Sequence, residues 1–263
     1  MSEGGLRFCV LGGGSKGNAT YVEAGGTRLL IDAGFSGREI EGRLAALGVD
    51  AADLTAILIS HEHGDHTRGA GVLSRRHRLP VLANRATLAA AGPSLANLAA
   101  VQEFAAGTTF VCGNIQVHPF AIPHDCAEPV GFLLKAGSRL LGHCTDLGSV
   151  PRLVHHRLSD CHALVLEANH DLEMLMAGPY PPALKQRVRS RHGHLANHET
   201  GAFLAQLLGR ELKQVVLSHL SETNNTPALV ERAVAAALNG RPAGSLPRIS
   251  IACQQKGSAM VCL

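Results

Sequence analysis

The stretch that decides the fold is Leu58-Ile59-Ser60-His61-Glu62-His63-Gly64-Asp65-His66, which begins in a short apolar run and ends in a cluster of metal-binding side chains. An imidazole binds Zn²⁺ or a similar ion through one ring nitrogen, and a carboxylate binds through oxygen. Alternate side chains of a loop that leaves a strand can converge, so His61 and His63 can share one ion. Asp65 and His66 then point to a second. Packing gives no reason for three histidines and an aspartate against an apolar strand, so the segment predicts a metal site.

The composition fits one α/β domain that spans residues 1–263. Apolar residues make up 46% of the chain, which is ordinary for a globular protein and argues against disorder. The formal net charge is +3, so any contact with nucleic acid has to come from a local basic patch. The chain has no Trp and only two Tyr, so a wide aromatic platform for stacking bases is not expected.

The cysteines and the chain start indicate a cytoplasmic protein. The seven Cys form no CxxC pair, which argues against a disulfide framework and a cysteine zinc finger. Free thiols in this number suggest a reducing cytosol. Residues Met1–Arg7 are polar and resemble no signal peptide, and no apolar run approaches the ~20 residues of a membrane span. We therefore expect no membrane partner.

Hydrophobic runs and turn residues predict a chain of short strands with helices after each set. The expected strands are Leu6–Leu11, Ala19–Ala24, Arg28–Ile31, Ala56–Ile59, Pro80–Ala83, Ile115–Ile122, Val130–Lys135, Arg139–Leu141, Ala163–Glu167, Gln214–Leu217 and Arg248–Ala252. Helices are expected over Glu39–Leu47, from a cap at Asn197 to Gly209, and from Thr226-Pro227 to Gly240. This order suits two sheets packed together and covered by helices.

The glycine-rich segment Gly12-Gly13-Gly14-Ser15-Lys16-Gly17 contains a GxGxxG pattern directly after a predicted strand. A dinucleotide site also needs a helix to open at the last glycine, because its N-terminus holds the pyrophosphate. The next residues are Asn18–Ala24 and then Gly25-Gly26, a sequence typical of a strand and a turn. We therefore expect a tight turn between two strands and no dinucleotide cofactor.

The HxHxDH pattern of residues 61–66 resembles the signature of the metallo-β-lactamase superfamily, and the resemblance continues along the chain in motif order. It implies an α/β fold in which two packed mixed β-sheets are flanked by helices, the αββα sandwich. It also implies two divalent metal ions. The first would be held by His61, His63 and His124, the second by Asp65, His66 and His219, with Asp146 bridging both. Asp32 matches the family's early structural aspartate, which supports the metal loop without binding an ion.

The residues themselves leave several of these assignments open. His118 competes with His124, and His170 competes with His219, because a lone histidine is more often structural than a ligand. Cys144 is a further candidate, since thiolates bind zinc well. The context after a strand favours His124 and His219, and the family pattern favours Asp146.

Two later segments narrow the reaction. Leu166–Asp171 and His192–Asn197 resemble elements of ribonuclease Z and related phosphodiesterases, in which a glutamate orients a histidine near the scissile phosphate. Carried over, Glu167 would orient His194, which would protonate the leaving oxygen or stabilise the charged phosphate. Two ions suit phosphoryl chemistry, because they can activate a water as a bridging hydroxide and clamp a phosphate oxygen. We count Asp65 among the catalytic residues, together with Glu167 and His194.

The same resemblance extends to the YycJ (WalJ) family of bacterial proteins through Gly13–Asn18, Phe120–Asp125, Glu167–Asp171 and Ser218–Asn225. It implies a 5′-to-3′ DNA exonuclease that uses manganese or zinc, and the same ligands also accept iron. A basic stripe before His192 suits contact with a DNA backbone without sequence preference, if the segment is extended. The stripe consists of Lys185, Arg187, Arg189 and Arg191.

Two other functions fit the same metal site. The first is hydrolysis of a small ester, thioester or lactone, and the second is an inactive or sensory metal-binding module. The first predicts turnover of ester analogues and indifference to DNA, and the second predicts tight metal binding without turnover.

Overall fold

Two mixed seven-stranded sheets form the centre of the computed structural model, which describes residues 5–208, 211–242, 244 and 246–263. Sheet A has the order β14 (Val261–Cys262), β1 (Arg7–Gly12), β2 (Ala19–Ala24), β3 (Thr27–Ile31), β4 (Ala56–Leu58), β5 (Pro80–Ala83) and β6 (Ala100–Glu103). Sheet B has the order β13 (Arg248–Ile251), β12 (Gln214–Ser218), β11 (Ala163–Glu167), β10 (Arg139–Cys144), β9 (Val130–Ala136), β8 (Ile115–Ala121) and β7 (Phe110–Cys112). In each sheet, antiparallel pairs at one side give way to parallel pairs at the other.

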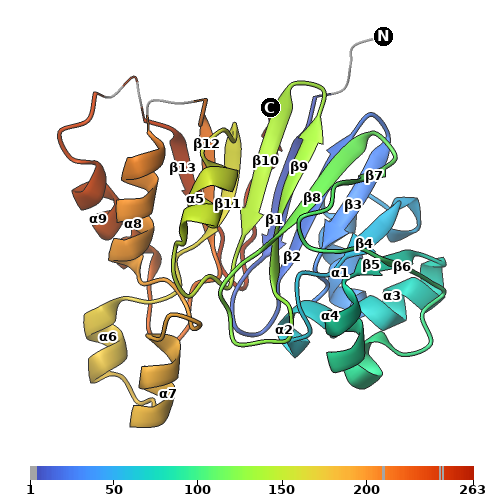
Figure 1. The fold of residues 1–263 in the computed structure, drawn as a ribbon, viewed down its shortest axis with the longest axis horizontal. Coiled ribbons are helices and arrows are strands. Elements are labelled where there is room, and N and C mark those ends of the chain that lie inside the picture. The colour runs from blue at the N-terminus through green and yellow to red at the C-terminus, as the bar shows by residue number, and fades with distance from the viewer. Residues whose placement is uncertain (1–4, 209–210, 243, 245) are drawn as a thin grey trace.

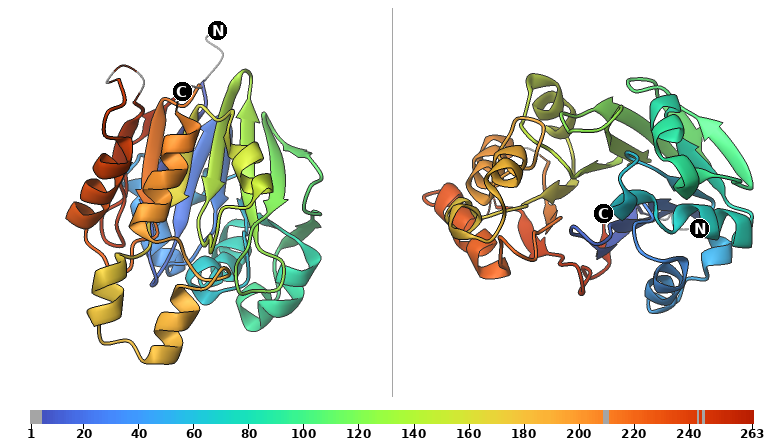
Figure 2. Two further views of the ribbon diagram at one scale, coloured as in Figure 1. Left: turned by 60° about the vertical axis from the view of Figure 1, so that its left-hand side comes forward. Right: turned by 90° about the horizontal axis from the view of Figure 1, so that it is seen from below.

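Helices cover both outer faces, as Figure 1 shows. Those on the side of sheet A are α1 (Gly37–Ala45), α2 (Gly64–Thr67), α3 (Ala70–His77) and α4 (Arg85–Ala90), with 3₁₀ turns at Ala51–Asp53 and Gly92–Leu95. Those on the side of sheet B are α5 (Arg152–Leu158), α8 (Asn197–Leu207) and α9 (Pro227–Leu238). The pair α6 (Leu172–Ala177) and α7 (Pro182–Val188) projects beyond the sheets (Figure 2). This arrangement confirms the predicted αββα sandwich. None of the helices in the described ranges has the length and apolarity to cross a membrane.

The core consists of three buried layers. Between the sheets, alternate residues of each strand meet, as Phe8 and Val22 of sheet A do with Phe132 and Val165 of sheet B. Each fully buried side chain of this size stabilises the fold by ~1.5–3 kcal/mol. The other two layers lie between each sheet and its helices. The short β11 is buried along its whole length, which is why its five residues are almost entirely apolar.

The predicted strands are confirmed to within about two residues at most ends, except that β10 extends to Cys144. The glycine-rich segment is a turn between the antiparallel β1 and β2, as expected. Two helix starts differ from the prediction. Helix α1 begins at Gly37 because Ser36 and Glu39 form a capping box.

Helix α8 is preceded by Ala196 rather than capped by Asn197, and its predicted end at Gly209 lies outside the described residues. The side chain of Asn197 instead exchanges two hydrogen bonds of 2.8 and 2.9 Å with that of Asn225, and Glu199 accepts from the Ala196 backbone N–H. Helix α9 begins after the Thr226 cap, as predicted, and its last helical residue is Leu238.

The expectation of an extended basic segment at residues 185–191 is wrong. Helix α7 contains Lys185 and Arg187, and Arg189 ends it. The physical reason is Pro182 at the first helical position, followed by residues that favour helix. In a helix, residues two apart point in nearly opposite directions, so Lys185 and Arg189 share one face and Arg187 lies on another.

Gly34, in the segment between β3 and α1, provides a test of how closely the chain is packed there. A Cβ at Gly34 would overlap the carbonyl oxygen of Asp65 and lie 2.6 Å from the backbone N of Asn18. Asn18 N donates to Asp65 O at 2.8 Å, so neither neighbour can move freely. We expect Gly34→Ala to lower the free energy of unfolding by at least about 1–3 kcal/mol in thermal or denaturant melts.

The matched control is Gly42→Ala in α1, where nothing lies within 4 Å of the added Cβ. There the same substitution should raise stability by ~0.5–1 kcal/mol, because alanine loses less backbone entropy in a helix. Equal melting temperatures for the two variants would contradict the packing argument.

Candidate metal centre

The candidate site lies where strands of both sheets end, near α2 at the lower edge of the sandwich in Figure 1. Its residues follow or end the strands β3, β4, β8, β10, β11 and β12, in the order Asp32, His61, His124, Asp146, Glu167 and His219. Asp32, Asp146 and His219 have φ of 60°, 56° and 59°, three of the five positive values among non-glycine residues of the described chain. Left-handed backbone at such residues is costly and persists only where the surroundings fix it.

Three histidines face one another through ring nitrogens. His61 Nε2 lies 3.1 Å from His63 Nδ1, and His124 Nε2 lies 3.3 Å from the same atom. Lone pairs at these distances repel unless a proton or a cation lies among them. Tetrahedral bonds of about 2.0–2.1 Å place ligand nitrogens about 3.3 Å apart, so the spacing fits an ion such as Zn²⁺.

Asp146 lies between this triad and a second group formed by Asp65, His66 and His219. His66 Nε2 is 3.5 Å from Asp65 Oδ2 and 3.2 Å from Asp146 Oδ2, and His219 Nε2 is 3.4 Å from Asp146 Oδ1. In the described chain, Asp146 Oδ2 and His219 Nε2 are buried and make no hydrogen bond. Such atoms are costly to bury without a partner, and a cation would supply it. The buried clusters are consistent with a dinuclear metal site.

Asp32 fixes the orientation of the loop that contains His61 and His66. Its carboxylate accepts hydrogen bonds from the backbone and the hydroxyl of Ser60 at 2.8 and 2.9 Å. It also accepts from His66 Nδ1 at 2.9 Å. Because the Ser60 hydroxyl donates to Asp32, its oxygen accepts from His61 Nδ1, 3.0 Å away. Both imidazoles therefore carry their proton on Nδ1 and direct Nε2 to the cluster.

Two more histidines are oriented from sheet B and its loops. His124 Nδ1 donates to the Gly193 carbonyl at 3.1 Å, and His219 Nδ1 donates to Glu167 Oε1 at 2.8 Å. Each ring is thereby left with Nε2 facing the cluster. Asn169 adds a hydrogen bond of 3.0 Å to the carbonyl of His219 and supports its left-handed backbone.

Glu167 is fully buried and accepts hydrogen bonds from four donors. His194 Nδ1 and His219 Nδ1 both donate to Oε1 at 2.8 Å, and the backbone N–H groups of Leu147 and Leu195 donate to Oε2. Burial alone would raise the pKa of Glu167, but the charge and hydrogen bond of His194, with those of His219, lower it to about 2. The carboxylate is therefore anionic at neutral pH and holds His194 at the edge of the cluster.

The electrostatics of the cluster favour a cation. Burial would lower the pKa of His219, but Asp146, Asp65 and Glu167 outweigh it and raise this pKa to about 10. The pKa of His66 is likewise raised, against burial, by Asp146 and Asp32. These carboxylates stabilise positive charge in the site, whether it is a proton or a metal ion.

The competing candidates lie elsewhere. His118 sits on β8 and contacts Thr109 at 2.9 Å, and His170 is buried beside the start of α8. Cys144 packs among apolar side chains between sheet B and its helices. In the described residues, none of the three belongs to a group that could hold a metal ion, whereas His124, His219 and Asp146 all do.

Asn18 is a site residue to which the sequence assigned no role. Its Nδ2 donates to Asp65 Oδ2 at 3.2 Å and lies 3.0 Å from His66 Nε2, while its backbone N binds Asp65 O. Its place at the end of the glycine-rich turn is the one signal in the sequence. Glycine is required at position 17 of that turn, because a Cβ there would lie 3.0 Å from the backbone of Gly34.

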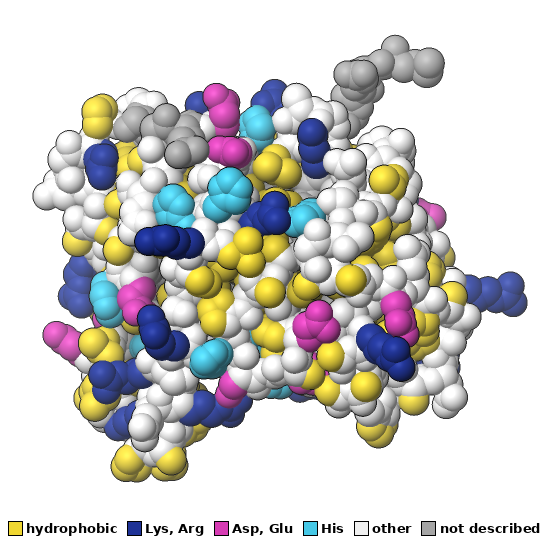
Figure 3. Space-filling model, in the orientation of Figure 1, with side chains coloured by type: hydrophobic (Ala, Val, Ile, Leu, Met, Phe, Trp, Pro, Cys, Tyr) yellow, Lys and Arg dark blue, Asp and Glu magenta, His cyan; other side chains and the backbone are white. Residues whose placement is uncertain are grey.

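The four basic residues before His192 separate into different environments. Arg187 forms an ion pair with Asp125, directly after His124. Lys185 donates to the carbonyl of Met176 in α6 at 2.6 Å, and Arg189 contacts the sulfur of the same residue. The side chain of Arg191 is exposed. Lys and Arg side chains gather over α6 and α7 at the lower left of Figure 3, so the basic character of this region remains although the predicted stripe does not.

Comparison with known proteins places the chain in a family. Residues 27–220 match the Beta-lactamase superfamily domain. The chain is 37% identical to exodeoxyribonuclease YycJ of Bacillus anthracis, over 91% of this chain and 92% of that protein. It is 36% identical to exodeoxyribonuclease WalJ of Streptococcus pneumoniae, over 87% of each chain. The metallo-β-lactamase fold protein YhfI of Bacillus subtilis superposes with a TM-score of 0.74 at 15% identity, over 97% of this chain and 99% of that one, which shows the shared fold. The chain thus belongs to the metallo-β-lactamase superfamily of hydrolases and is a homologue of the exodeoxyribonucleases YycJ and WalJ.

Proposed function

We propose that the chain is a dinuclear metal-dependent exonuclease that hydrolyses phosphodiester bonds of DNA in the 5′-to-3′ direction. The observation that carries the proposal is the Glu167–His194 pair at the edge of the metal cluster, with a 2.8 Å hydrogen bond. A phosphodiester needs an acid for its leaving oxygen, and this pair supplies one beside the metal ligands. The direction of cleavage is taken from the resemblance to the YycJ (WalJ) family.

The metal ligands follow from the fit of the donor atoms. His61, His63 and His124 would hold one ion, and Asp65, His66 and His219 would hold the second, with Asp146 between both. Bound divalent ions supply Lewis acidity toward the phosphate and make water nucleophilic at neutral pH. Histidine and carboxylate ligands accept zinc, manganese or iron, and we favour manganese or zinc.

His194 acts on the leaving oxygen through Nε2. Its Nδ1 is occupied by Glu167, which leaves Nε2 as the nitrogen that can face a substrate, and the side chain is 21% exposed. The buried carboxylate fixes the orientation of the ring, as a buried aspartate does for a catalytic histidine in acyl transfer. Glu167 is a positioning residue in this scheme, because it touches His194 rather than the substrate.

DNA binding relies on backbone contacts without sequence preference. Basic side chains over α6 and α7 lie beside the site, and both YycJ and WalJ are named exodeoxyribonucleases. The chain has few aromatic residues for reading bases. Cations near phosphates supply affinity that depends strongly on salt and little on sequence.

The first test uses linear DNA labelled at one end, incubated with the purified protein and Mn²⁺. We expect the 5′ label to be released as a mononucleotide from the start, and a 3′ label to remain on progressively shorter strands. A chelator should stop the reaction, and Asp65→Asn should reduce it by about 100-fold or more, because even supporting residues of metal sites contribute ~10–100-fold. If the DNA stays intact under all conditions, the substrate of the metal site would instead be RNA, a small phosphodiester or an ester.

The second test separates acid catalysis from metal binding. His194→Ala should slow DNA hydrolysis by about 10²–10⁴-fold while the metal content, measured by elemental analysis, stays at the wild-type value. The matched control is His192→Ala, two residues away and exposed, which should leave the rate unchanged. Loss of metal in His194→Ala would mean that the ligand assignment is wrong.

The third test concerns the basic side chains. Lys185→Ala and Arg189→Ala should each lower the slope of log affinity against log salt concentration by about one for DNA binding. Lys135→Ala is the control, because this exposed lysine lies near the far end of β9, away from the site. Unchanged slopes for both α7 variants would place the DNA on another surface.

A further inference from the structure

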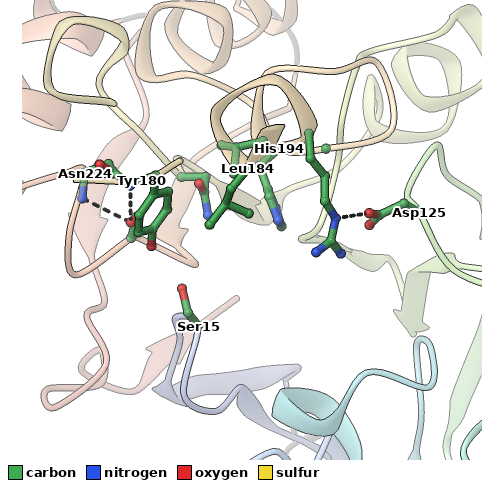
Figure 4. A pocket seen from close by; sticks show the side chains of 11 residues that line it. Ser15, Asp125, Tyr180, Leu184, His194 and Asn224 are labelled. Atoms are coloured by element: carbon green, nitrogen blue, oxygen red, sulfur yellow. Dashed lines mark hydrogen bonds and ion pairs between the residues drawn. The ribbon is translucent and has the colours of Figure 1, made fainter. Parts of the chain in front are cut away.

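A pocket of about 210 Å³ opens beside His194 between the metal site and the α6–α7 pair (Figure 4). Tyr180 and Asn224 lie on one side of His194 in this view and Asp125 on the other, with Ser15 of the glycine-rich turn opposite. The volume is below the ~300–1,000 Å³ of sites for drug-sized ligands, so the pocket accommodates at most one nucleoside-sized group.

The two ends of the pocket differ in charge. Arg187, paired with Asp125, supplies the cation at one end, and its Nη atoms remain available to a phosphate. The wall beyond Tyr180 contains Asn169, Ser221 and Asn224, which are polar and uncharged. A phosphate therefore suits the first end, whereas hydroxyl and base-edge groups suit the second.

Tyr180 is an aromatic side chain that the proposed chemistry does not use. The other tyrosine, Tyr21, is fully buried and donates to Glu23. Tyr180 is half-buried in the wall of the pocket and stands between Pro179 and Pro181. Proline fixes its own backbone φ and restricts the residue before it, so the ring is presented from a stiff segment. A rigid aromatic ring at the edge of a nuclease site can stack on one base.

Asn224 adds a buried amide to the wall at this end of the pocket. The side chain is 1% exposed, and its Oδ1 accepts no hydrogen bond from any described residue. Its Nδ2 is 3.5 Å from Ser221 Oγ, a weak contact. A Cβ at Gly178 would lie 2.7 Å from this Oδ1, so the atom lies against Gly178, and the amide contributes to the wall at this end of the pocket.

We propose that this pocket is a subsite for the nucleoside that leaves with its 3′-oxygen, with its base stacked on Tyr180 and the remaining strand directed toward Arg187. The inference rests on the proposed function. Hydrolysis forms a bond from water oxygen to phosphorus and breaks the bond from phosphorus to the 3′-oxygen. His194 gives its proton to that oxygen, so the departing nucleoside is the group next to His194. In the 5′-to-3′ direction this group is the terminal nucleotide, released as a nucleoside 5′-monophosphate.

The test measures binding of the product rather than turnover. Wild-type protein loaded with Mn²⁺ should bind dAMP about 10-fold more tightly than 2-deoxyribose 5-phosphate in calorimetric titrations, because the latter has no base to stack. Tyr180→Phe should keep this preference, and Tyr180→Ala should lose it. Leu153→Ala, on the exposed side of α5, is the control for effects of substitution away from the pocket. It should bind both probes as the wild type does.

Three outcomes decide the question. Equal binding of both probes by the wild type, or an unchanged preference in Tyr180→Ala, overturns the stacking subsite even if DNA is degraded. A preference that depends on Tyr180 supports the subsite. If that preference is present but linear DNA stays intact, the nucleotide subsite stands and the exonuclease proposal fails, so the two failures are distinguishable.

Discussion

The rest of the site depends on a set of hydrogen bonds made on the side of each imidazole that faces away from the cluster. Asp32, the Ser60 hydroxyl, the Gly193 carbonyl and Glu167 together engage the Nδ1 atoms of four of the clustered histidines. A neutral imidazole has one donor and one acceptor nitrogen, so these bonds decide which nitrogen faces inward. Without them, the rings could rotate or change tautomer, and the close nitrogen spacing would be lost. The acceptors are buried and lie in both halves of the sandwich, which makes the two sheets a single support for the candidate metal ligands.

The sandwich explains why ligands so distant in sequence meet. Strands β3, β4, β10, β11 and β12 end at one edge, and each places a polar residue just beyond or at its last position. The carboxyl ends of parallel strands share one edge of a sheet, and packing two sheets face to face brings two such edges together. Asp146 and His219 turn sharply at that point with left-handed backbone, which directs their side chains back across the edge. The strain is local, and the surrounding hydrogen bonds maintain it.

Much of this could be predicted from sequence, because it is encoded locally. The HxHxDH loop at residues 61–66 and the apolar strands that precede the candidate ligands are visible as patterns. The structure has these strands and brings the loop's side chains into clusters that could hold a metal ion. The role of Asn18 could not be predicted, since it depends on contacts with Asp65, 47 residues away. The helical form of residues 182–188 was missed because alternating charges suit an extended chain equally well, and the effect of Pro182 outweighs them. The prediction was wrong in this segment because the helix propensity of its residues outweighed the alternating charge pattern.

The Arg187–Asp125 pair connects the mouth of the site to the metal ligands. Asp125 follows His124, and His124 is itself held by the carbonyl of Gly193, just before His194. Residues that would contact substrate and residues that would hold metal are thus adjacent along the chain in two separate loops. Exposed ion pairs add little to stability, and the side chain of Arg187 is 57% exposed. The pair is therefore better explained as a means of orienting the guanidinium at the mouth than as a support for the fold.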